Sequence, residues 1–185
     1  MKRTFIAVKI IITNQTENFI RGIEKALDKE SVKWVDTQNM HITLRFLGYT
    51  QENVIDEIGN RLSEHLNQFG TFKLICKGFG VFKNLHSPRV LWLGIEKSDE
   101  LTKLKEEIDC VLLDFGYEKE ERAFQPHLTL GRVKNIKDKE TLKRLLSQYK
   151  NTYIQKFVID KVIFYESILT RKGPVYKMLR ECRLN

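Results

Sequence analysis

The stretch His41-Ile42-Thr43-Leu44 decides how this chain is interpreted, because nearly the same residues recur as His127-Leu128-Thr129-Leu130. The aliphatic residues in both stretches favour β-strands. Side chains on a strand alternate between its two faces, so each histidine should share a face with the threonine two residues later. Two such strands brought together would present two imidazoles and two hydroxyls to one cleft. That arrangement suits acid–base chemistry on a phosphate ester.

The two motifs occupy the same place in a longer repeat. A shift of 86 residues carries His41 onto His127 and a β-rich segment at residues 4–11 onto residues 90–97. The same shift relates further expected elements in pairs: helices at 52–67 and 138–153, strands at 71–82 and 157–168, and strands at 89–95 and 175–181. The pattern predicts two similar α/β lobes that each offer a sheet to a central cleft. A final strand around Tyr176 is expected to complete the second lobe.

Local signals indicate where elements begin and end. Asn14 or Thr16 can cap the first helix, and Gly70 stands where the cap at the end of a later helix is expected. No linker or low-complexity segment separates the two halves of the repeat. Residues 1–185 are therefore expected to form a single bilobal domain.

Length and composition favour a folded protein with an anionic partner. With 185 residues and 42% hydrophobic content, the chain can bury a core of its own. Lys and Arg number 32 against 24 Asp and Glu, and the net charge of +8 favours a polyanion such as nucleic acid. The apolar runs are far too short to span a membrane, and no apolar signal block opens the chain. We therefore expect a cytoplasmic protein with no membrane partner.

The remaining chemistry-bearing residues give no sign of a cofactor. Cys76, Cys110 and Cys182 are widely spaced and form no Cys-x-x-Cys or Cys/His cluster, so they are expected to be reduced thiols used as small apolar residues. Acidic residues do not gather around either histidine motif, as a two-metal nuclease would require. We expect no metal and no other cofactor.

The histidine pair can supply both proton transfers of a phosphodiester hydrolysis. Imidazole titrates near neutral pH, so one histidine can accept a proton from water while the other gives one to the departing oxygen. Thr43 and Thr129 can each donate a hydrogen bond to a phosphate oxygen, where charge grows in the transition state. So simple a site suits a strained leaving group, and the five-membered cyclic phosphate at an RNA end is strained.

These motifs resemble those of the 2H phosphoesterase superfamily, and within it those of the RNA 2′,3′-cyclic phosphodiesterases, also known as 2′-5′ RNA ligases. The resemblance covers nearly the whole chain. It rests on Arg3-Thr4-Phe5-Ile6-Ala7, the unbroken HITLRFLG at 41–48, Gly80-Val81-Phe82, Arg89-Val90-Leu91-Trp92, Pro126 to Arg132, and Ser167 with Gly173-Pro174-Val175-Tyr176.

The resemblance implies an α+β fold with an antiparallel sheet in each of two pseudo-symmetric lobes. It also implies hydrolysis of a terminal 2′,3′-cyclic phosphate to a 2′-phosphomonoester, with reversible 2′-5′ joining in some members. His41 would be the proton donor to the leaving 3′-oxygen and His127 the proton acceptor, while Thr43 and Thr129 would bind the phosphate. Because the two histidines are pseudo-equivalent, the sequence pattern leaves open which is acid and which is base. The expected partner is RNA with cyclic phosphate ends, such as tRNA fragments, and the expected oligomeric state is a monomer.

Three further residues near the motifs have ambiguous orientations. Arg132 suits a phosphate because its guanidinium matches phosphate geometry and stays charged, yet five residues after His127 it would point away from that histidine on a regular strand. We therefore expect Gly131 to end or bend the strand. Phe46, at the matching offset in the first motif, is expected to pack in the core rather than to stack on a base. Arg45 shares the parity of the first histidine and could equally line the cleft or lie on the surface.

Two other functions remain open. A related activity could act on 2′-5′ oligonucleotides or on small cyclic nucleotides, or the basic cleft could bind RNA ends without turnover. Intact histidines and threonines in both motifs argue against the binding module. His65 and His86 have no motif around them and are expected to play no part in the chemistry.

Overall fold

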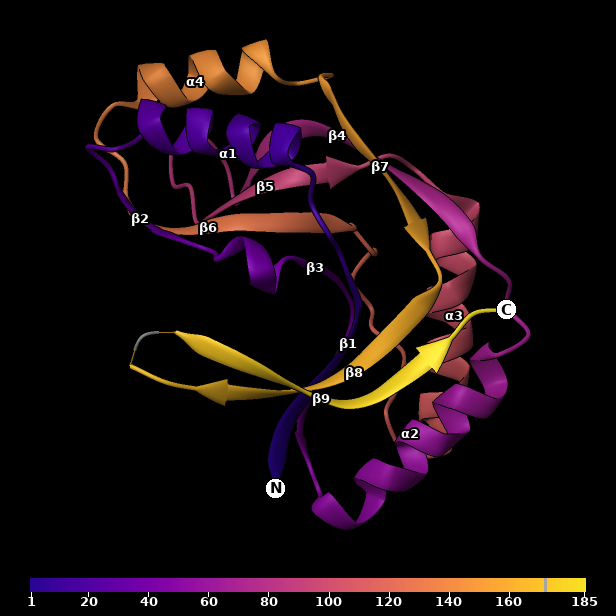
Figure 1. Ribbon diagram of the computed structural model, residues 1–185. Helices are drawn as coiled ribbons and strands as arrows, with labels where there is room; N and C mark the ends of the chain where they lie inside the picture. The colour runs from indigo at the N-terminus through magenta and orange to yellow at the C-terminus, as the bar shows by residue number, and fades with distance from the viewer. Residues whose placement is uncertain (172) are drawn as a thin grey trace.

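Two antiparallel sheets form the framework of the computed structural model, which describes residues 1–171 and 173–185 (Figure 1). The first sheet has the strand order β3-β1-β8-β9 and the second the order β2-β6-β5-β4-β7. The strands are β1 (Lys2–Lys9), β2 (Ser31–Trp34), β3 (His41–Thr50), β4 (Phe72–Phe82), β5 (Val90–Ile95), β6 (His127–Asn135), β7 (Tyr153–Ile159), β8 (Lys161–Leu169) and β9 (Pro174–Arg183). The predicted α+β class with two antiparallel sheets is confirmed.

Two pairs of helices cover the sheets. The helices are α1 (Asn14–Ala26), α2 (Glu52–Leu66), α3 (Asp99–Leu113) and α4 (Lys139–Gln148), with a short 3-10 helix, η1 (Thr37–Asn39). Helices α2 and α3 pack on each other and on the four-stranded sheet, whereas α1 and α4 lie on the five-stranded sheet (Figure 1). Buried Ile20 and Ile23 of α1, and Ile58 and Leu62 of α2, recur at helical spacing and form the packed faces.

The lobes are not the two consecutive halves of the chain. Strand β4 of the first half pairs with β5 of the second, while β8 and β9 return to pair with β1. The expectation that the last strand completes the second lobe is therefore wrong. A single strand over residues 157–168 is also wrong, since the chain leaves one sheet after Ile159 and enters the other at Lys161. Exchange of strands makes each lobe depend on both halves of the repeat.

Strands β1 and β5, which pair with the two motif strands, are related by a shift of 85 residues, whereas the two histidines are 86 residues apart. Ala7 pairs with Thr43, and Trp92 pairs with Thr129. The predicted overlay of residues 4–11 on 90–97 is therefore one residue out of register. Because a one-residue slip exchanges the two faces of a strand, Trp92 and not its neighbour shares a face with the motif threonine.

Each motif strand contains a β-bulge at the same position. The ladder between β1 and β3 skips Leu44, and the ladder between β5 and β6 skips Leu130. A bulge adds one residue to one strand and reverses the alternation of side chains beyond it. We call the side of each strand that carries its motif histidine the histidine face. Beyond the bulges, Phe46 and Arg132 return to this face.

Several helix ends differ from the sequence signals. Thr13 caps α1, because its hydroxyl accepts a hydrogen bond from the Thr16 amide at 3.3 Å, so neither Asn14 nor Thr16 is the cap. Helix α2 ends before Asn67, and Gly70 instead forms the turn into β4 with a φ of +84°. Thr13, Asn14 and Thr16 all carry side chains that can cap a helix, so the sequence alone does not select among them.

A single cluster of buried apolar side chains extends through both sheets and all four helices. Cys76 and Cys182 are buried within it, as expected, whereas Cys110 is exposed. A smaller cluster of Phe5, Ala7, Ile163 and Tyr165 lies on the histidine face of the four-stranded sheet. In the described part of the chain, none of the helices has the length and apolar character needed to cross a bilayer.

Candidate active site

The two motif histidines lie at the start of two strands, one from each sheet, that contact each other. His41 is the first residue of β3 and His127 the first residue of β6, and these strands contact each other. The positive charge of His127 contributes to the lowered pKa of His41, so the two imidazoles are within electrostatic reach. The structure thus brings together the two motifs that the repeat related.

Both imidazoles are held in the same way by the chain that precedes them. Nδ1 of His41 lies 2.6 Å from the carbonyl oxygen of Asn39, and Nδ1 of His127 lies 2.8 Å from that of Gln125. A carbonyl oxygen only accepts hydrogen bonds, so each Nδ1 carries a proton and donates it. The exchangeable position of each ring is therefore Nε2, the nitrogen left for proton transfer.

Aromatic side chains surround His41. The ring of Phe5 lies 5.1 Å from the imidazole, and the ring of Tyr176 meets it edge-on at 5.1 Å. Tyr165 stacks on Phe5 at 5.2 Å. Burial among these rings is the main reason that the pKa of His41 is lowered, and the hydrogen bond to the Asn39 carbonyl opposes the shift.

His127 has different neighbours. Phe82 meets its ring edge-on at 4.8 Å, and Trp92 lies 5.2 Å from Phe82. The Trp92 indole covers Gly80 so closely that a Cβ there would lie 2.1 Å from the ring. Burial again lowers the pKa of His127, and the nearby positive charge of Arg132 lowers it further. The two histidines are matched in backbone support but not in surroundings.

The predicted phosphate ligands gather on the same side. Thr43 and Thr129 are half-buried and share the histidine face of their strands. Arg132 is exposed, and its charge affects the pKa of both His127 and Tyr176. A guanidinium so placed can meet a phosphate held between the two imidazoles.

Strand β6 does not end at Gly131, because it continues to Asn135, but its pairing with β5 is broken by a bulge immediately before Gly131, where a strand bends. The bulge at Leu130 places Arg132 on the histidine face. An isolated sequence does not show this bulge, since the skipped residue is defined only by pairing with β5.

Phe46 and Arg45 also differ from expectation for the same reason. The bulge at Leu44 returns Phe46 to the histidine face, where 54% of the residue is exposed and its ring lies 5.7 Å from Phe5. Core packing of Phe46 is therefore wrong. Arg45 lies neither in the cleft nor on the surface, because it points into the interior with 6% exposure.

Sequence reasoning gave no role to Phe5, Tyr176, Phe82 or Trp92. All four lie in segments that carried the family resemblance, but their contact with the histidines depends on strand pairing. The other two histidines lie away from the motifs: Nε2 of His65 is 2.6 Å from a Glu107 carboxylate oxygen, and the carbonyl of His86 accepts a hydrogen bond from Lys139.

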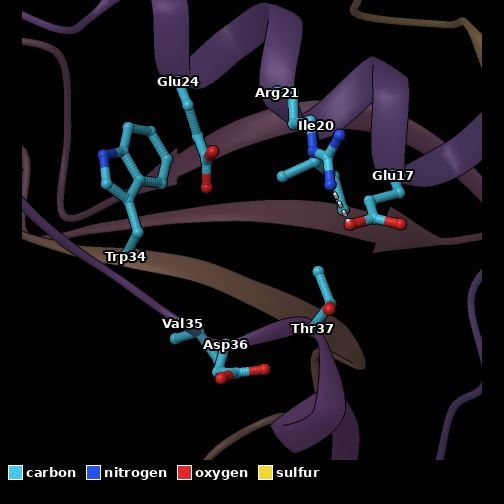
Figure 2. A pocket seen from close by; sticks show the side chains of 8 residues that line it. All are labelled: Glu17, Ile20, Arg21, Glu24, Trp34, Val35, Asp36 and Thr37. Atoms are coloured by element: carbon cyan, nitrogen blue, oxygen red, sulfur yellow. Dashed lines mark hydrogen bonds and ion pairs between the residues drawn. The ribbon is translucent and has the colours of Figure 1, made fainter.

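A separate groove lies between α1 and the segment that leads to η1 (Figure 2). Its lining includes Glu17, Glu24 and Asp36, and the one arginine in it, Arg21, is paired with Glu17 at 2.7 Å. Carboxylates repel a phosphate, so this groove is not where a polyanion binds. Among residues 1–171 and 173–185, no group of three or more His, Cys, Asp or Glu side chains is arranged to hold a metal ion.

Known proteins share both this sequence and this fold. Residues 14–169 match the model of the 2′-5′ RNA ligase superfamily. A protein of Thermotoga maritima named RNA 2′,3′-cyclic phosphodiesterase is 40% identical over 98% of this chain and 95% of its own length. A protein of the same name from Archaeoglobus fulgidus is 37% identical over 96% of this chain and 98% of its own.

Solved structures agree on the fold. The crystal structure of TT0787 of Thermus thermophilus superposes with a TM-score of 0.80 at 20% identity, covering 98% of this chain and 97% of the other. The structure of Escherichia coli LigT complexed with 3′-AMP gives a TM-score of 0.77 at 22% identity, covering 100% and 98%. The sequence match extends over both histidine motifs and the strands that carry them. This chain therefore belongs to the 2′-5′ RNA ligase superfamily.

Proposed function

We propose that this protein is an RNA 2′,3′-cyclic phosphodiesterase, which hydrolyses a terminal 2′,3′-cyclic phosphate to a 2′-phosphomonoester. One observation carries the proposal: two imidazoles on adjoining strands are fixed in the same tautomer by the carbonyls of Asn39 and Gln125. Each imidazole keeps Nε2 for proton transfer, as a two-histidine acid–base mechanism needs. The family and its curated relatives support the same activity.

In the proposed reaction, Nε2 of His127 accepts a proton from water as the water oxygen attacks phosphorus. The bond between phosphorus and the 3′-oxygen breaks, and Nε2 of His41 gives its proton to that oxygen. Over the whole reaction the two histidines together hold the same number of protons, since His127 gains one proton and His41 loses one. Each transfer contributes roughly 10²- to 10⁴-fold in rate.

The unequal surroundings of the histidines support this assignment of roles. Burial lowers the pKa of both imidazoles, and Arg132 lowers that of His127 further, which favours the neutral form that acts as a base. Phe46 occupies the matching position in β3 and carries no charge. The sequence pattern alone could not break the symmetry; the family resemblance assigns the acid to His41 and the base to His127, and this difference in charge favours the same direction.

The phosphate would lie between the two threonines. Thr43 and Thr129 are positioned on the histidine faces to donate hydrogen bonds to non-bridging oxygens, and Arg132 would add a charge-assisted contact. These donors would stabilise the charge that develops in the transition state. Phe46 would support the base of the terminal nucleotide, because an exposed ring beside the phosphate site suits stacking.

We further infer that the protein acts as a monomer in the cytoplasm on RNA ends such as those of tRNA fragments, and that residues 1–185 form one bilobal domain. One buried cluster through both sheets supports a single domain. A site assembled within one chain supports a monomer. The net charge of +8 favours RNA, and free thiols suit a reducing compartment.

The proposal is tested with an oligoribonucleotide that ends in a 2′,3′-cyclic phosphate, incubated with the purified protein in excess EDTA. We expect a 2′-phosphate end, identified by chromatography against 2′- and 3′-phosphate standards, and no loss of rate from EDTA. His65→Ala is the matched control for the variants His41→Ala and His127→Ala, because His65 lies on α2 and outside the site. Absence of product, a 3′-phosphate end, or dependence on metal would contradict the proposal.

Joining of RNA ends through a 2′-5′ bond is the second candidate, favoured by the name of the superfamily model. In the joining reaction the 5′-hydroxyl takes the place of water: Nε2 of His127 accepts its proton as its oxygen attacks phosphorus, the bond to the 3′-oxygen breaks, and Nε2 of His41 gives its proton to that oxygen. Supplying a second RNA with a free 5′-hydroxyl would reveal joined product. A panel that includes 2′-5′ oligonucleotides and small cyclic nucleotides would separate the remaining related activities.

A further inference from the structure

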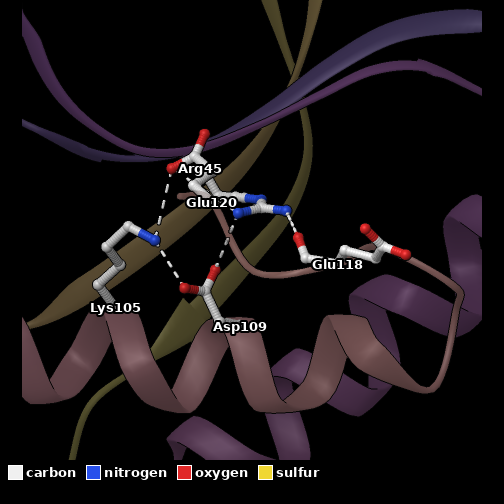
Figure 3. Close-up of polar contacts among 5 residues, drawn as sticks. All are labelled: Arg45, Lys105, Asp109, Glu118 and Glu120. Atoms are coloured by element: carbon white, nitrogen blue, oxygen red, sulfur yellow. Dashed lines mark hydrogen bonds and ion pairs between the residues drawn. The ribbon is translucent and has the colours of Figure 1, made fainter. Parts of the chain in front are cut away.

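A group of charged residues, three of them buried and two exposed, joins the strand of the first histidine to the connection that leads to the second. This connection, residues 114–126, runs from α3 to the start of β6. Arg45 of β3, with Lys105 and Asp109 of α3, contacts this connection (Figure 3). We call this group the Arg45 clamp; its members are Arg45, Lys105, Asp109, Glu118 and Glu120.

The clamp satisfies charges that would be costly to bury alone. The guanidinium of Arg45 donates a hydrogen bond to the backbone carbonyl of Glu118 and lies 3.6 Å from Asp109 and 3.7 Å from Glu120. Lys105 reaches the same two carboxylates, at 2.6 Å and 3.5 Å. Two cations therefore face two carboxylates at ion-pair distance, while Nε and Nη1 of Arg45 and Oδ1 of Asp109 are buried without a hydrogen-bond partner.

The connection that leads to His41 is bound to the opposite motif strand in another way, by backbone hydrogen bonds between β2 and β6. Trp34 stands seven residues before His41 and pairs with Gly131 of β6. Glu120 stands seven residues before His127, and Arg45 occupies the position in β3 that Gly131 has in β6. One connection is thus bound to the opposite motif strand by β2, and the other by the Arg45 clamp.

The difference follows from the side chains. A Cβ on Gly131 would lie 2.7 Å from a Val32 methyl, so strand β2 approaches β6 closely only because glycine is there. The long side chain of Arg45 prevents such an approach. Its planar fork of donors spans the wider gap and binds a carbonyl and carboxylates together.

The clamped connection ends in the residues that hold His127. Nζ of Lys105 lies 5.8 Å from the ring centre of Phe124, which packs against the core. The next residue, Gln125, supplies the carbonyl that binds Nδ1 of His127. The path from Arg45 to the second imidazole therefore runs through the ion pairs of Asp109 with Arg45 and with Lys105, the contact of Lys105 with the Phe124 ring, and the hydrogen bond from His127 to Gln125.

We propose that Arg45 is a positioning residue for His127. By binding the connection before β6 to the strand that carries His41, it fixes the carbonyl that sets the tautomer of His127. Its kinetic consequence rests on the proposed phosphodiesterase function, but its effect on the imidazole does not. Loss of the clamp would therefore disturb one histidine and leave the other in place.

Two substitutions test the clamp without removing all its charge. Arg45→Lys keeps the cation but loses the fork that reaches the Glu118 carbonyl. Glu120→Gln removes the partner that is 40% exposed and leaves the buried pair with Asp109 intact, so this variant should fold even where the first does not. The matched control is Arg61→Met, which breaks the exposed ion pair with Asp114 at the start of the same connection.

The first measurement is the ¹⁵N-resolved spectrum of the histidine side chains, which distinguishes the two tautomers. We expect both clamp variants to reduce the Nδ1–H form of His127, with His41 unchanged, and the control to alter neither. Unchanged spectra in folded clamp variants, or equal changes at both histidines, would overturn the proposal.

The second measurement is the kinetics on the cyclic-phosphate oligonucleotide. We expect at least a tenfold fall in kcat with KM within threefold, and wild-type values for the control. An unchanged kcat, or a loss that appears in KM instead, would also overturn it. A wild-type protein without phosphodiesterase activity would refute the proposed function, and the spectra would still decide the role of Arg45.

Discussion

Phe46 and Arg132 occupy matching positions in the two halves of the site, each five residues after its motif histidine and on the same face as that histidine. On a regular strand, a residue five positions away would lie on the opposite face. The bulges at Leu44 and Leu130 bring both side chains back. A pseudo-symmetric scaffold thus presents an aromatic ring on one side of the cleft and a cation on the other.

Phe46→Leu should raise KM for the cyclic-phosphate oligonucleotide with little change in kcat. Stacking of a base on an aromatic ring contributes about 1–3 kcal/mol, which corresponds to roughly 5- to 150-fold in binding. Phe46→Trp should retain the wild-type KM. The measurement is steady-state kinetics, with Tyr153→Leu as the control because Tyr153 is an exposed aromatic of β7, at the far edge of the other sheet. Equal effects of Phe46→Leu and the control would refute base stacking.

Arg132→Met should weaken binding of the phosphate and shift the pH profile. The charge of Arg132 helps to lower the pKa of His127, so removing it should raise that pKa. If His127 is the base, the acid limb of the kcat/KM profile moves to higher pH. Lys134→Met, an exposed position two residues further along β6, is the control. A shift of the alkaline limb alone would assign the base to His41 instead.

The stability of the protein should fall as the pH drops below 6.5. Burial lowers the pKa of His41 and His127 in the folded state from 6.5, so the unfolded chain binds more protons in this range. Stability from these groups is therefore complete above pH 6.5 and is lost as the pH falls toward the folded-state values. Urea unfolding at pH 7.5 and pH 5.5 measures the difference.

The double variant His41→Asn and His127→Asn supplies the control for this measurement. Asparagine does not titrate, so the loss of stability between the two pH values should be smaller in the variant. An equal loss in both proteins would assign the pH dependence to other groups.

His41→Ala and His127→Ala should each lower kcat by at least about 10², because each removes one proton transfer. Binding of the RNA should change little, since the threonines and Arg132 remain. Fluorescence anisotropy with a non-hydrolysable 2′-phosphate product measures the binding. Turnover at the wild-type rate in either variant would disprove the paired mechanism.

Gly131→Ala should destabilise the fold by about 1–3 kcal/mol, the usual cost of overpacking. The added methyl would meet Val32 at 2.7 Å and push β2 away from β6. Gly22→Ala is the control, because nothing lies within 4 Å of its added Cβ in α1 and alanine favours a helix. Urea unfolding at neutral pH compares the two. A wild-type stability for Gly131→Ala would show that β2 yields at no cost.

The histidine motifs were predictable because each depends on local alternation alone. His41 and Thr43 share a face by the geometry of any strand, and the repeat at His127 indicates that two such strands act together. The orientation of Arg45 was not predictable in this way, because it follows from the residue that β1 leaves unpaired. Nor does the sequence of Tyr176 reveal that β9 returns to the first sheet, next to His41.

Residue patterns along the chain were enough to predict the two-lobed α+β plan, to single out the paired histidines and threonines, and to indicate an anionic partner. Periodicity, repetition and charge are properties of the chain that survive any detail of packing. Which strands share a sheet and where the bulges fall became known from the fold, and with them the finding that Phe46 and Arg132 face the site while Arg45 is buried. Those features arise from hydrogen bonding between segments far apart in sequence, and a shift of one residue in that pairing exchanges the faces of a strand.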